Sequence, residues 1–169
     1  MIFFACRWYN YIIEVKQMEE YTRRVQYYET DKMSFVHHSN HIRWFEEARL
    51  DYMDKIGIPY KMLEDMGYLC PVLSAECKYR KSIHFNDTVK ILTKLTYMDN
   101  VRHFFSYQII DAEDGTLLTT GKTEHCFLNS NGRVITLKKH NPEIFEKIMS
   151  NVEDEIFPNA KRTASTDKK

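Results

Sequence analysis

The spacing of apolar residues changes from helical to alternating near the middle of the chain. Before that change, the segment from about His38 to Ile56 carries apolar side chains at helical spacing on one face, with Arg49 as the exception. Trp44 and Ala48 widen the apolar surface, so we expect this helix to be covered on more than one side. The apolar positions of its main face are Ile42, Phe45, Tyr52, Met53 and Ile56.

Shorter elements are expected on either side of the long helix. Residues 21–29 alternate in character and predict a strand before it. Gly57 and Pro59 end the long helix, and Pro59 starts a second, short helix to about residue 66. At the other end of the chain, Asn141 and Pro142 are typical of an N-cap and a first helical residue. They predict a final helix whose core side is Phe145, Ile148 and Met149.

From residue 73 onward the pattern has a period of two residues, which is typical of strands with one buried face. The turns Asp114-Gly115 and Asn131-Gly132 separate the later runs. We therefore expect an antiparallel meander that can wrap around the long helix. Its predicted strands are residues 73–80, 89–97, 102–111, 117–128 and a short fifth run at 133–137.

Composition narrows the class of protein. The 169 residues favour one folded domain, and 24 basic residues balance 24 acidic ones. Without a broad basic field, no nucleic-acid partner is expected. The four cysteines contain no Cys-x-x-Cys pair and indicate free thiols in a reducing compartment, the cytoplasm.

The two ends of the chain differ from its centre. Residues 1–13 are apolar and aromatic, but Arg7 and Asn10 interrupt them, so they are too short to span a membrane and do not resemble a signal peptide. We treat 1–17 as an atypical extension, 18–152 as the functional domain and 153–169 as a polar tail. No membrane span is expected.

Asp31 and His38 are the chemically most informative pair, because they flank the start of the long helix. A carboxylate there lies near the free N–H donors and the positive end of the helix dipole. A carbonyl held between the two could be polarised from one side and attacked, directly or through water, from the other. This arrangement suits ester or thioester hydrolysis.

The same residues resemble a known family. Tyr28-Glu29-Thr30-Asp31, Val36, His38 and Asn40, followed by Phe45-Glu46-Glu47-Ala48-Arg49, are similar to the opening motif of hotdog-fold thioesterases of the 4-hydroxybenzoyl-CoA thioesterase type, which includes the Tol-Pal-associated acyl-CoA thioesterases. Three later segments are weaker matches that occur in the family's order: residues 71–72, 86–91 and 120–127. Two positions depart from the pattern, Ser34 in place of Gly and His41 in place of Tyr.

The resemblance implies an α+β hotdog fold, in which an antiparallel sheet wraps a long central helix. It implies that Asp31 is the catalytic carboxylate and that the backbone N–H of His38 polarises the thioester carbonyl. It also implies a homodimer or homotetramer with the active site between subunits. No metal or bound cofactor is needed.

Other residues have both an ordinary and a functional interpretation. Asn40 either caps the helix, holds the loop of Asp31 or binds substrate. Glu46 either pairs with Arg49 on the helix surface, orients the motif from inside or binds substrate. His37 and His41 lie one helical turn apart but lack a third ligand, so they do not predict a metal site. The basic candidates for binding coenzyme A phosphates are Lys78, Arg80, Lys81 and Lys122.

We therefore predict an acyl-CoA thioesterase that releases a free acid and CoA. The first alternative is a non-catalytic acyl-CoA-binding hotdog module, and the second is a protein with a structural or partner-binding role. A hotdog dehydratase would yield an enoyl product in place of a free thiol.

Overall fold

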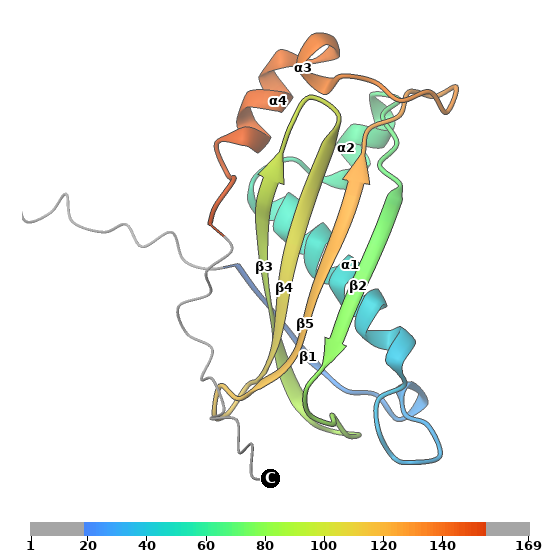
Figure 1. Ribbon diagram of the computed structural model, residues 1–169, viewed down its shortest axis with the longest axis vertical. Coiled ribbons are helices and arrows are strands. Elements are labelled where there is room, and N and C mark those ends of the chain that lie inside the picture. The colour runs from blue at the N-terminus through green and yellow to red at the C-terminus, as the bar shows by residue number, and fades with distance from the viewer. Residues whose placement is uncertain (1–18, 155–169) are drawn as a thin grey trace, which may run out of the picture.

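The computed structural model describes residues 19–154, which form one five-stranded antiparallel sheet with a long helix across one face (Figure 1). The order of strands in the sheet is β1-β3-β4-β5-β2. The strands are β1 (Glu19–Arg24), β2 (Val72–Tyr79), β3 (Thr88–Met98), β4 (Arg102–Asp111) and β5 (Leu117–Cys126). This arrangement confirms the predicted sheet around a central helix.

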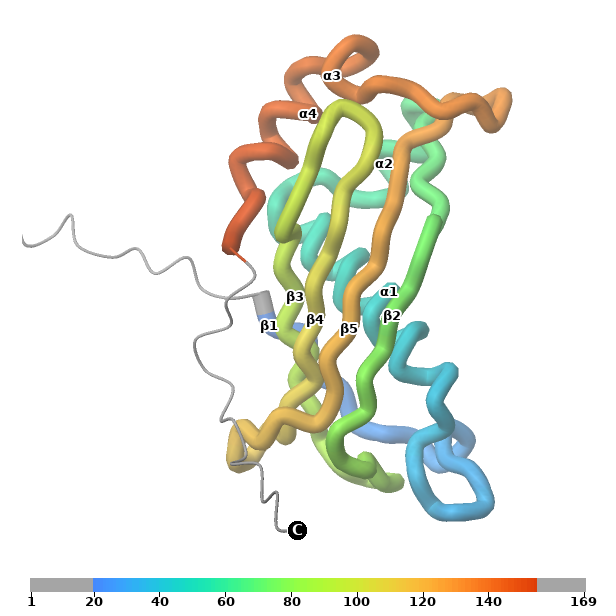
Figure 2. Tube along the Cα trace, viewed as in Figure 1, coloured from blue at the N-terminus to red at the C-terminus, as the bar shows by residue number. Residues whose placement is uncertain are grey.

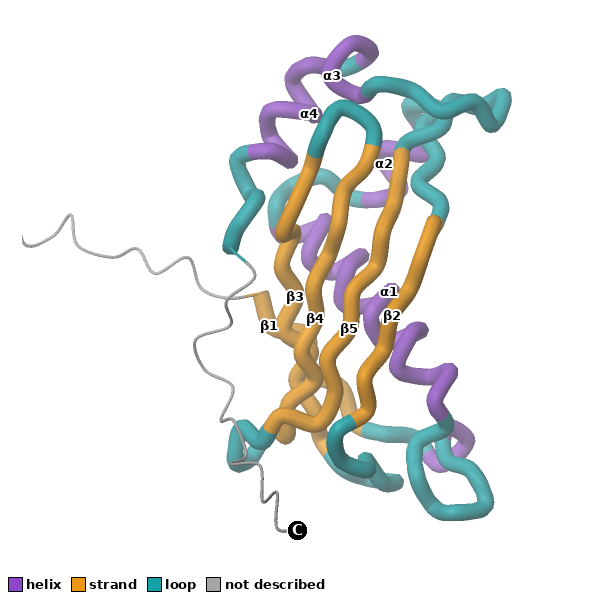
Figure 3. The backbone as a smooth tube through the Cα atoms, in the orientation of Figure 1, coloured by secondary structure: helices purple, strands orange, loops and turns teal. Residues whose placement is uncertain are grey.

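The long helix, α1 (His38–Lys55), lies behind the sheet (Figure 3). Two short helices, α3 (Leu137–His140) and α4 (Pro142–Met149), lie at the end where β3 turns into β4. Helix α2 (Tyr60–Asp65) follows α1, and Tyr27–Glu29 form a 3-10 turn. Asn141 caps α4 by accepting a hydrogen bond from the Ile144 amide at 3.1 Å, as predicted. Within residues 19–154, no helix is long and apolar enough to cross a membrane.

Aromatic contacts join α1 to the sheet. The Phe45 ring stacks on Tyr107 of β4 with 4.5 Å between centroids, and Tyr52 meets Phe105 edge-on at 5.6 Å. Buried aromatic side chains of this kind dominate the energetics of a core. Trp44 is also fully buried, so α1 is covered on more than one side, as its sequence predicts.

Two predicted strands differ from the structure. The first ends at Arg24 rather than near residue 29, because the chain leaves the sheet and enters the 3-10 turn. The predicted run at 133–137 is not a strand: only Val134 makes an isolated bridge, to Leu128, and Leu137 already begins α3. Each departure follows from long-range contacts that a local alternation does not encode.

Strand β2 forms one edge of the sheet, on the far side from β1 (Figure 2). Its only paired neighbour among the described residues is β5. Its apolar side chains are strongly exposed, including Val72 at 53%, Leu73 at 51% and Tyr79 at 51%. An open, apolar edge of this kind is a pairing surface for another strand.

Candidate active site

Asp31 lies in a tight turn between β1 and α1. The turn closes through an isolated bridge between Thr30 and Val36 and through a bond from the Ser34 amide to the Asp31 carbonyl at 2.9 Å. The Asp31 carboxylate accepts a bond from the Met33 amide on Oδ1 at 2.7 Å. Within residues 19–154, Oδ2 has no hydrogen-bond partner, which leaves one carboxylate oxygen for chemistry.

The turn places Ser34 in the left-handed region, with φ at 63°. A side chain in that region brings Cβ close to the backbone, which costs roughly 1–2 kcal/mol relative to glycine. This explains why glycine is the usual residue at the position in the family that the motif resembles. Ser34 adopts this positive φ at an energetic cost.

We expect Ser34→Gly to raise the free energy of unfolding by about 0.5–1 kcal/mol, because relief of strain exceeds the added freedom of the unfolded chain. Urea denaturation measures this change. Ser130→Gly is the control, since Ser130 is exposed and has no positive φ. A decrease in stability for Ser34→Gly would contradict the strain.

A buried glutamate anchors the base of this turn. Glu29 is 3% exposed and accepts bonds from Arg23 at 2.6 Å, from the Trp44 indole at 2.8 Å and from the Gln26 amide at 2.7 Å. Its carbonyl accepts a bond from the Asn40 side chain, also at 2.8 Å. Asn40 therefore holds the loop that carries Asp31. Sequence reasoning missed this anchoring role of Glu29, because Arg23 and Trp44 reach it from β1 and α1.

The N-terminus of α1 closes the other side of the site. His38 is the first helical residue, and its amide donates no hydrogen bond within the described part of the chain. The Tyr79 hydroxyl donates to the His38 carbonyl at 3.2 Å, which ties the end of β2 to the helix start. Asp31 and His38 line one cavity of about 360 Å³ together with His41, Tyr79 and Arg80.

A second cavity, of about 310 Å³, brings together three of the predicted basic residues. Lys78, Arg80 and Lys122 line it, along with Glu76, whose carboxylate offsets part of their charge. Arg80 lines both cavities. Lys81 lines only the first.

Glu46 lies away from this arrangement. It is exposed and lines neither cavity. Glu46 and Arg49, both described, form no ion pair, because Arg49 is buried with its guanidinium 5.4 Å from the Tyr60 ring. Glu47, the residue after Glu46, forms an ion pair with Arg23 of β1 instead of with another residue of α1.

Comparison with known proteins identifies the family of this chain. The family model described as the thioesterase-like superfamily matches residues 25–157. The chain belongs to the thioesterase-like superfamily. The expected hotdog fold and the expected enzyme class, thioester hydrolase, are thereby confirmed, whereas the finer resemblance to the 4-hydroxybenzoyl-CoA type stays a prediction.

Several relatives cover most of the thioesterase domain. An Aquifex aeolicus protein provisionally named an esterase is 36% identical over 126 residues, which are 75% of this chain and 96% of the relative. A Bacillus subtilis protein provisionally named an acyl-CoA thioesterase is 25% identical over 119 residues, 70% of this chain and 86% of the relative. The crystal structure of a DHNA-CoA thioesterase from Staphylococcus aureus has a TM-score of 0.75 and 34% identity, over 78% of this chain and 89% of that one.

His41 of the thioesterase, which stands in place of the family's usual Tyr, is a neutral wall of the first cavity. It is 4% exposed, its Nδ1 lies 3.3 Å from the Thr119 hydroxyl, and its ring packs between Trp44 and Tyr79. Burial, together with the positive charge that His38 can carry, lowers the pKa of His41 to about 4. His37, one helical turn before His41, is exposed, and its Nδ1 lies 2.9 Å from the Ser39 hydroxyl.

We expect this neutral His41 to make the thioesterase sensitive to acid. A folded-state pKa of about 4, below the ordinary 6.5, means that the unfolded chain binds the proton first. Stability is therefore lost as pH falls below 6.5, by about 2 kcal/mol at pH 5. Urea midpoints between pH 7.5 and 5 should fall less steeply for His41→Tyr than for wild type. His140→Tyr, at an exposed position, should keep the wild-type slope; equal slopes for all three would contradict this assignment.

Proposed function

We propose that this thioesterase hydrolyses acyl-CoA thioesters to a free acid and CoA, with Asp31 as nucleophile or general base. One observation carries the proposal: the Asp31 carboxylate and the start of α1 line the same cavity. The available Oδ2 of Asp31 supports an attacking or proton-accepting role. A module that only binds acyl-CoA gains nothing from a carboxylate beside the thioester.

The chemistry needs stabilisation of an oxyanion as well as attack. In the proposed reaction the thioester oxygen faces the His38 amide, where the helix dipole favours negative charge. Water, or Asp31 followed by water, adds to the carbonyl carbon, and the carbon–sulfur bond breaks. The CoA thiolate leaves and takes up a proton, while the acyl group becomes a carboxylic acid.

The two cavities, which share Arg80, suit the two parts of an acyl-CoA molecule. The first has apolar and aromatic walls, among them Met33, Phe35, Tyr79 and Ile83, and is the proposed acyl site. The second, with Lys78, Arg80 and Lys122, is the proposed site for CoA phosphates, which basic side chains bind well. Asn40 and Glu46, the other two predicted substrate-binding residues, stay predictions.

The proposal includes a second copy of the chain and a cytoplasmic setting. The exposed apolar edge of β2 supports pairing with the same strand of another subunit, in a homodimer or in a tetramer of two such dimers. Tyr79 links that edge directly to the helix start. Free Cys70, Cys77 and Cys126 suit a reducing compartment such as the cytoplasm.

Steady-state release of free thiol from a panel of CoA thioesters tests the proposal. The panel runs from acetyl to palmitoyl-CoA and includes benzoyl-CoA and DHNA-CoA, since the similar Staphylococcus aureus enzyme is named for the latter. We expect turnover of at least one acyl-CoA, with free acid and CoA in equal amounts. Tight binding without turnover across the panel would favour the binding module, and an enoyl product would favour a dehydratase.

A further inference from the structure

A cluster of three metal-ligating side chains lies inside the molecule, away from the proposed active site. Cys70 comes from the segment before β2, while His103 and His125 face each other across the paired strands β4 and β5. The three are 8%, 4% and 0% exposed. One ligand atom from each lies within 4.8 Å of the other two.

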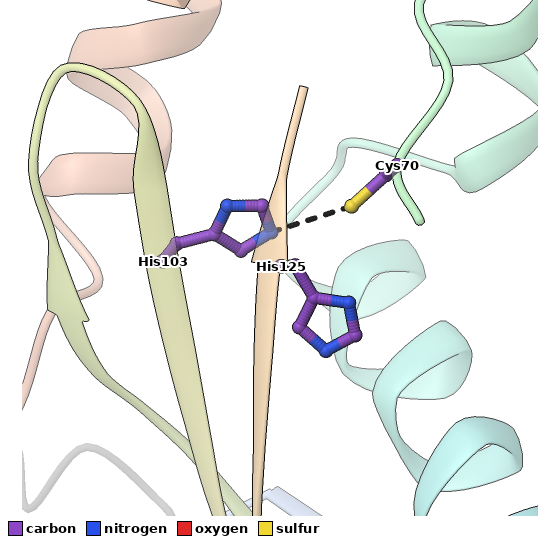
Figure 4. Close-up of side chains that lie close together, drawn as sticks. All are labelled: Cys70, His103 and His125. Carbon is purple, nitrogen blue, oxygen red and sulfur yellow. Dashed lines mark hydrogen bonds between the residues drawn. The ribbon is translucent and has the colours of Figure 1, made fainter. Parts of the chain in front are cut away.

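The His103 ring points at the Cys70 sulfur, and the His125 ring lies close to both (Figure 4). His103 Nε2 lies 3.4 Å from Cys70 Sγ. His125 Nε2 makes a hydrogen bond of 2.8 Å with the Thr123 hydroxyl. The other ring nitrogen, Nδ1, lies on the side of the Cys70 thiol. That Nδ1 is buried and makes no hydrogen bond of ordinary geometry within residues 19–154, although the Pro71 backbone acts as a weak hydrogen-bond partner of the His125 ring.

The donor set fits a particular class of metal ion. A thiolate with two neutral imidazoles suits Zn²⁺ and Cu⁺, and no hard carboxylate ligand belongs to the cluster. Ligand atoms around such an ion lie roughly 3.5 Å apart, from metal–ligand bonds of about 2.0–2.3 Å. The Cys70–His103 pair already has this spacing, so binding needs only a small inward shift of the third ligand.

We propose that Cys70, His103 and His125 form a buried site for one thiophilic closed-shell metal ion, Cu⁺ or Zn²⁺. The site does not depend on the proposed acyl-CoA hydrolysis. The metal replaces the Cys70 thiol proton, which leaves to solvent, and accepts lone pairs from His103 Nε2 and His125 Nδ1. No electron transfer is involved.

The surroundings of the cluster already hold two of its ligands in place. The Thr123 hydroxyl that meets His125 Nε2 also lies 2.9 Å from the Tyr107 hydroxyl, so a buried chain of hydrogen bonds fixes the imidazole. Outer partners of this kind orient histidine ligands in metal sites. On the other side, the Tyr60 hydroxyl donates to the Cys70 carbonyl at 2.9 Å and fixes the backbone that carries the thiol.

Nearby charge favours the monovalent ion. The buried Arg49 guanidinium acts electrostatically on both Cys70 and His125. Cu⁺ with one thiolate is neutral, whereas Zn²⁺ with one thiolate keeps a positive charge next to Arg49. A net charge is costly in a buried setting. We therefore expect the preference for Cu⁺ over Zn²⁺ to be stronger here than in a solvent-exposed Cys-His-His site.

Metal titration of the full-length protein tests the site. Cu⁺ is supplied without oxygen in competition with a coloured Cu⁺ chelator, and Zn²⁺ is followed by equilibrium dialysis. We expect the wild type to bind one equivalent of metal and Cys70→Ser to lose at least about 100-fold in metal affinity. That loss exceeds the loss of affinity usual when a residue that only hydrogen-bonds to a ligand is replaced. Cys77→Ser, which removes a thiol on β2 outside the cluster, should bind like wild type.

X-ray absorption of the metal-loaded wild type provides a readout that needs no variant. We expect one sulfur and two imidazole nitrogens around the metal, and a rise in Tm of about 5 °C with excess metal. A first shell without sulfur, binding that Cys70→Ser leaves unchanged, or no binding of either ion would overturn the proposal. If Cys70→Ser does not fold, the wild-type first shell alone decides.

Discussion

Replacing Asp31 by Asn is expected to lower kcat for acyl-CoA hydrolysis by at least about 100-fold, the scale of losing a nucleophile or general base. The Asn side chain keeps an Oδ1 acceptor for the Met33 amide, so the turn should stay intact. The loss should appear in kcat more than in KM. It is measured by free-thiol release with the best substrate of the panel.

An exposed acid at the other end of α1 controls for the loss of one negative charge. Asp54, exposed near the end of α1, lines neither of the two cavities, so Asp54→Asn should leave kcat unchanged. Urea denaturation should also give Asp31→Asn a stability close to wild type. Near wild-type turnover in folded Asp31→Asn would remove this residue from the mechanism.

Gly121→Ala should cost about 3 kcal/mol of stability, at the upper end of the range for overpacking a core. A Cβ on Gly121 would lie 2.2 Å from the Phe45 ring and 2.9 Å from the Glu76 carbonyl. Neither neighbour can move easily, because Phe45 stacks on Tyr107 and Glu76 belongs to the adjacent strand. Urea denaturation of the variant measures the loss.

A double substitution separates this clash from other effects. Phe45→Leu shortens the side chain that meets the new methyl group, so Phe45→Leu with Gly121→Ala should be more stable than the sum of the single losses predicts. Strict additivity would show that the Phe45 ring is not the source of strain.

Periodicity predicted most of this fold because most of its elements are long and regular. Strand β4 has the predicted bounds of 102–111, and α1 ends within one residue of its predicted end at 56. The start of α4 was predicted from the Asn141-Pro142 cap alone. Local pattern is informative wherever one face of an element is buried along its whole length.

Sites assembled from distant segments were harder to predict. The turn of Asp31 was found because its residues are adjacent and resemble a motif. The role of Glu29 as the anchor of that turn was not found, because Arg23 and Trp44 reach it from β1 and α1. The Cys70, His103 and His125 cluster has no short spacing at all. Only the pairing of β4 with β5 brings its two histidines together.

The anchoring of the Asp31 turn has a consequence for how substrate preference can change. Glu29 and Asn40 hold its beginning, and the Val36 amide fixes its end by bonding to the Ile83 carbonyl at 2.8 Å. The tip between these clamps, residues 32–35, is exposed, and Phe35 within it pairs with His84 through a bridge and an edge-on ring contact. Side chains in residues 32–35 can therefore be substituted, in evolution or in a library of variants, and part of the cavity wall changes with them. The Asp31 carboxylate stays in place.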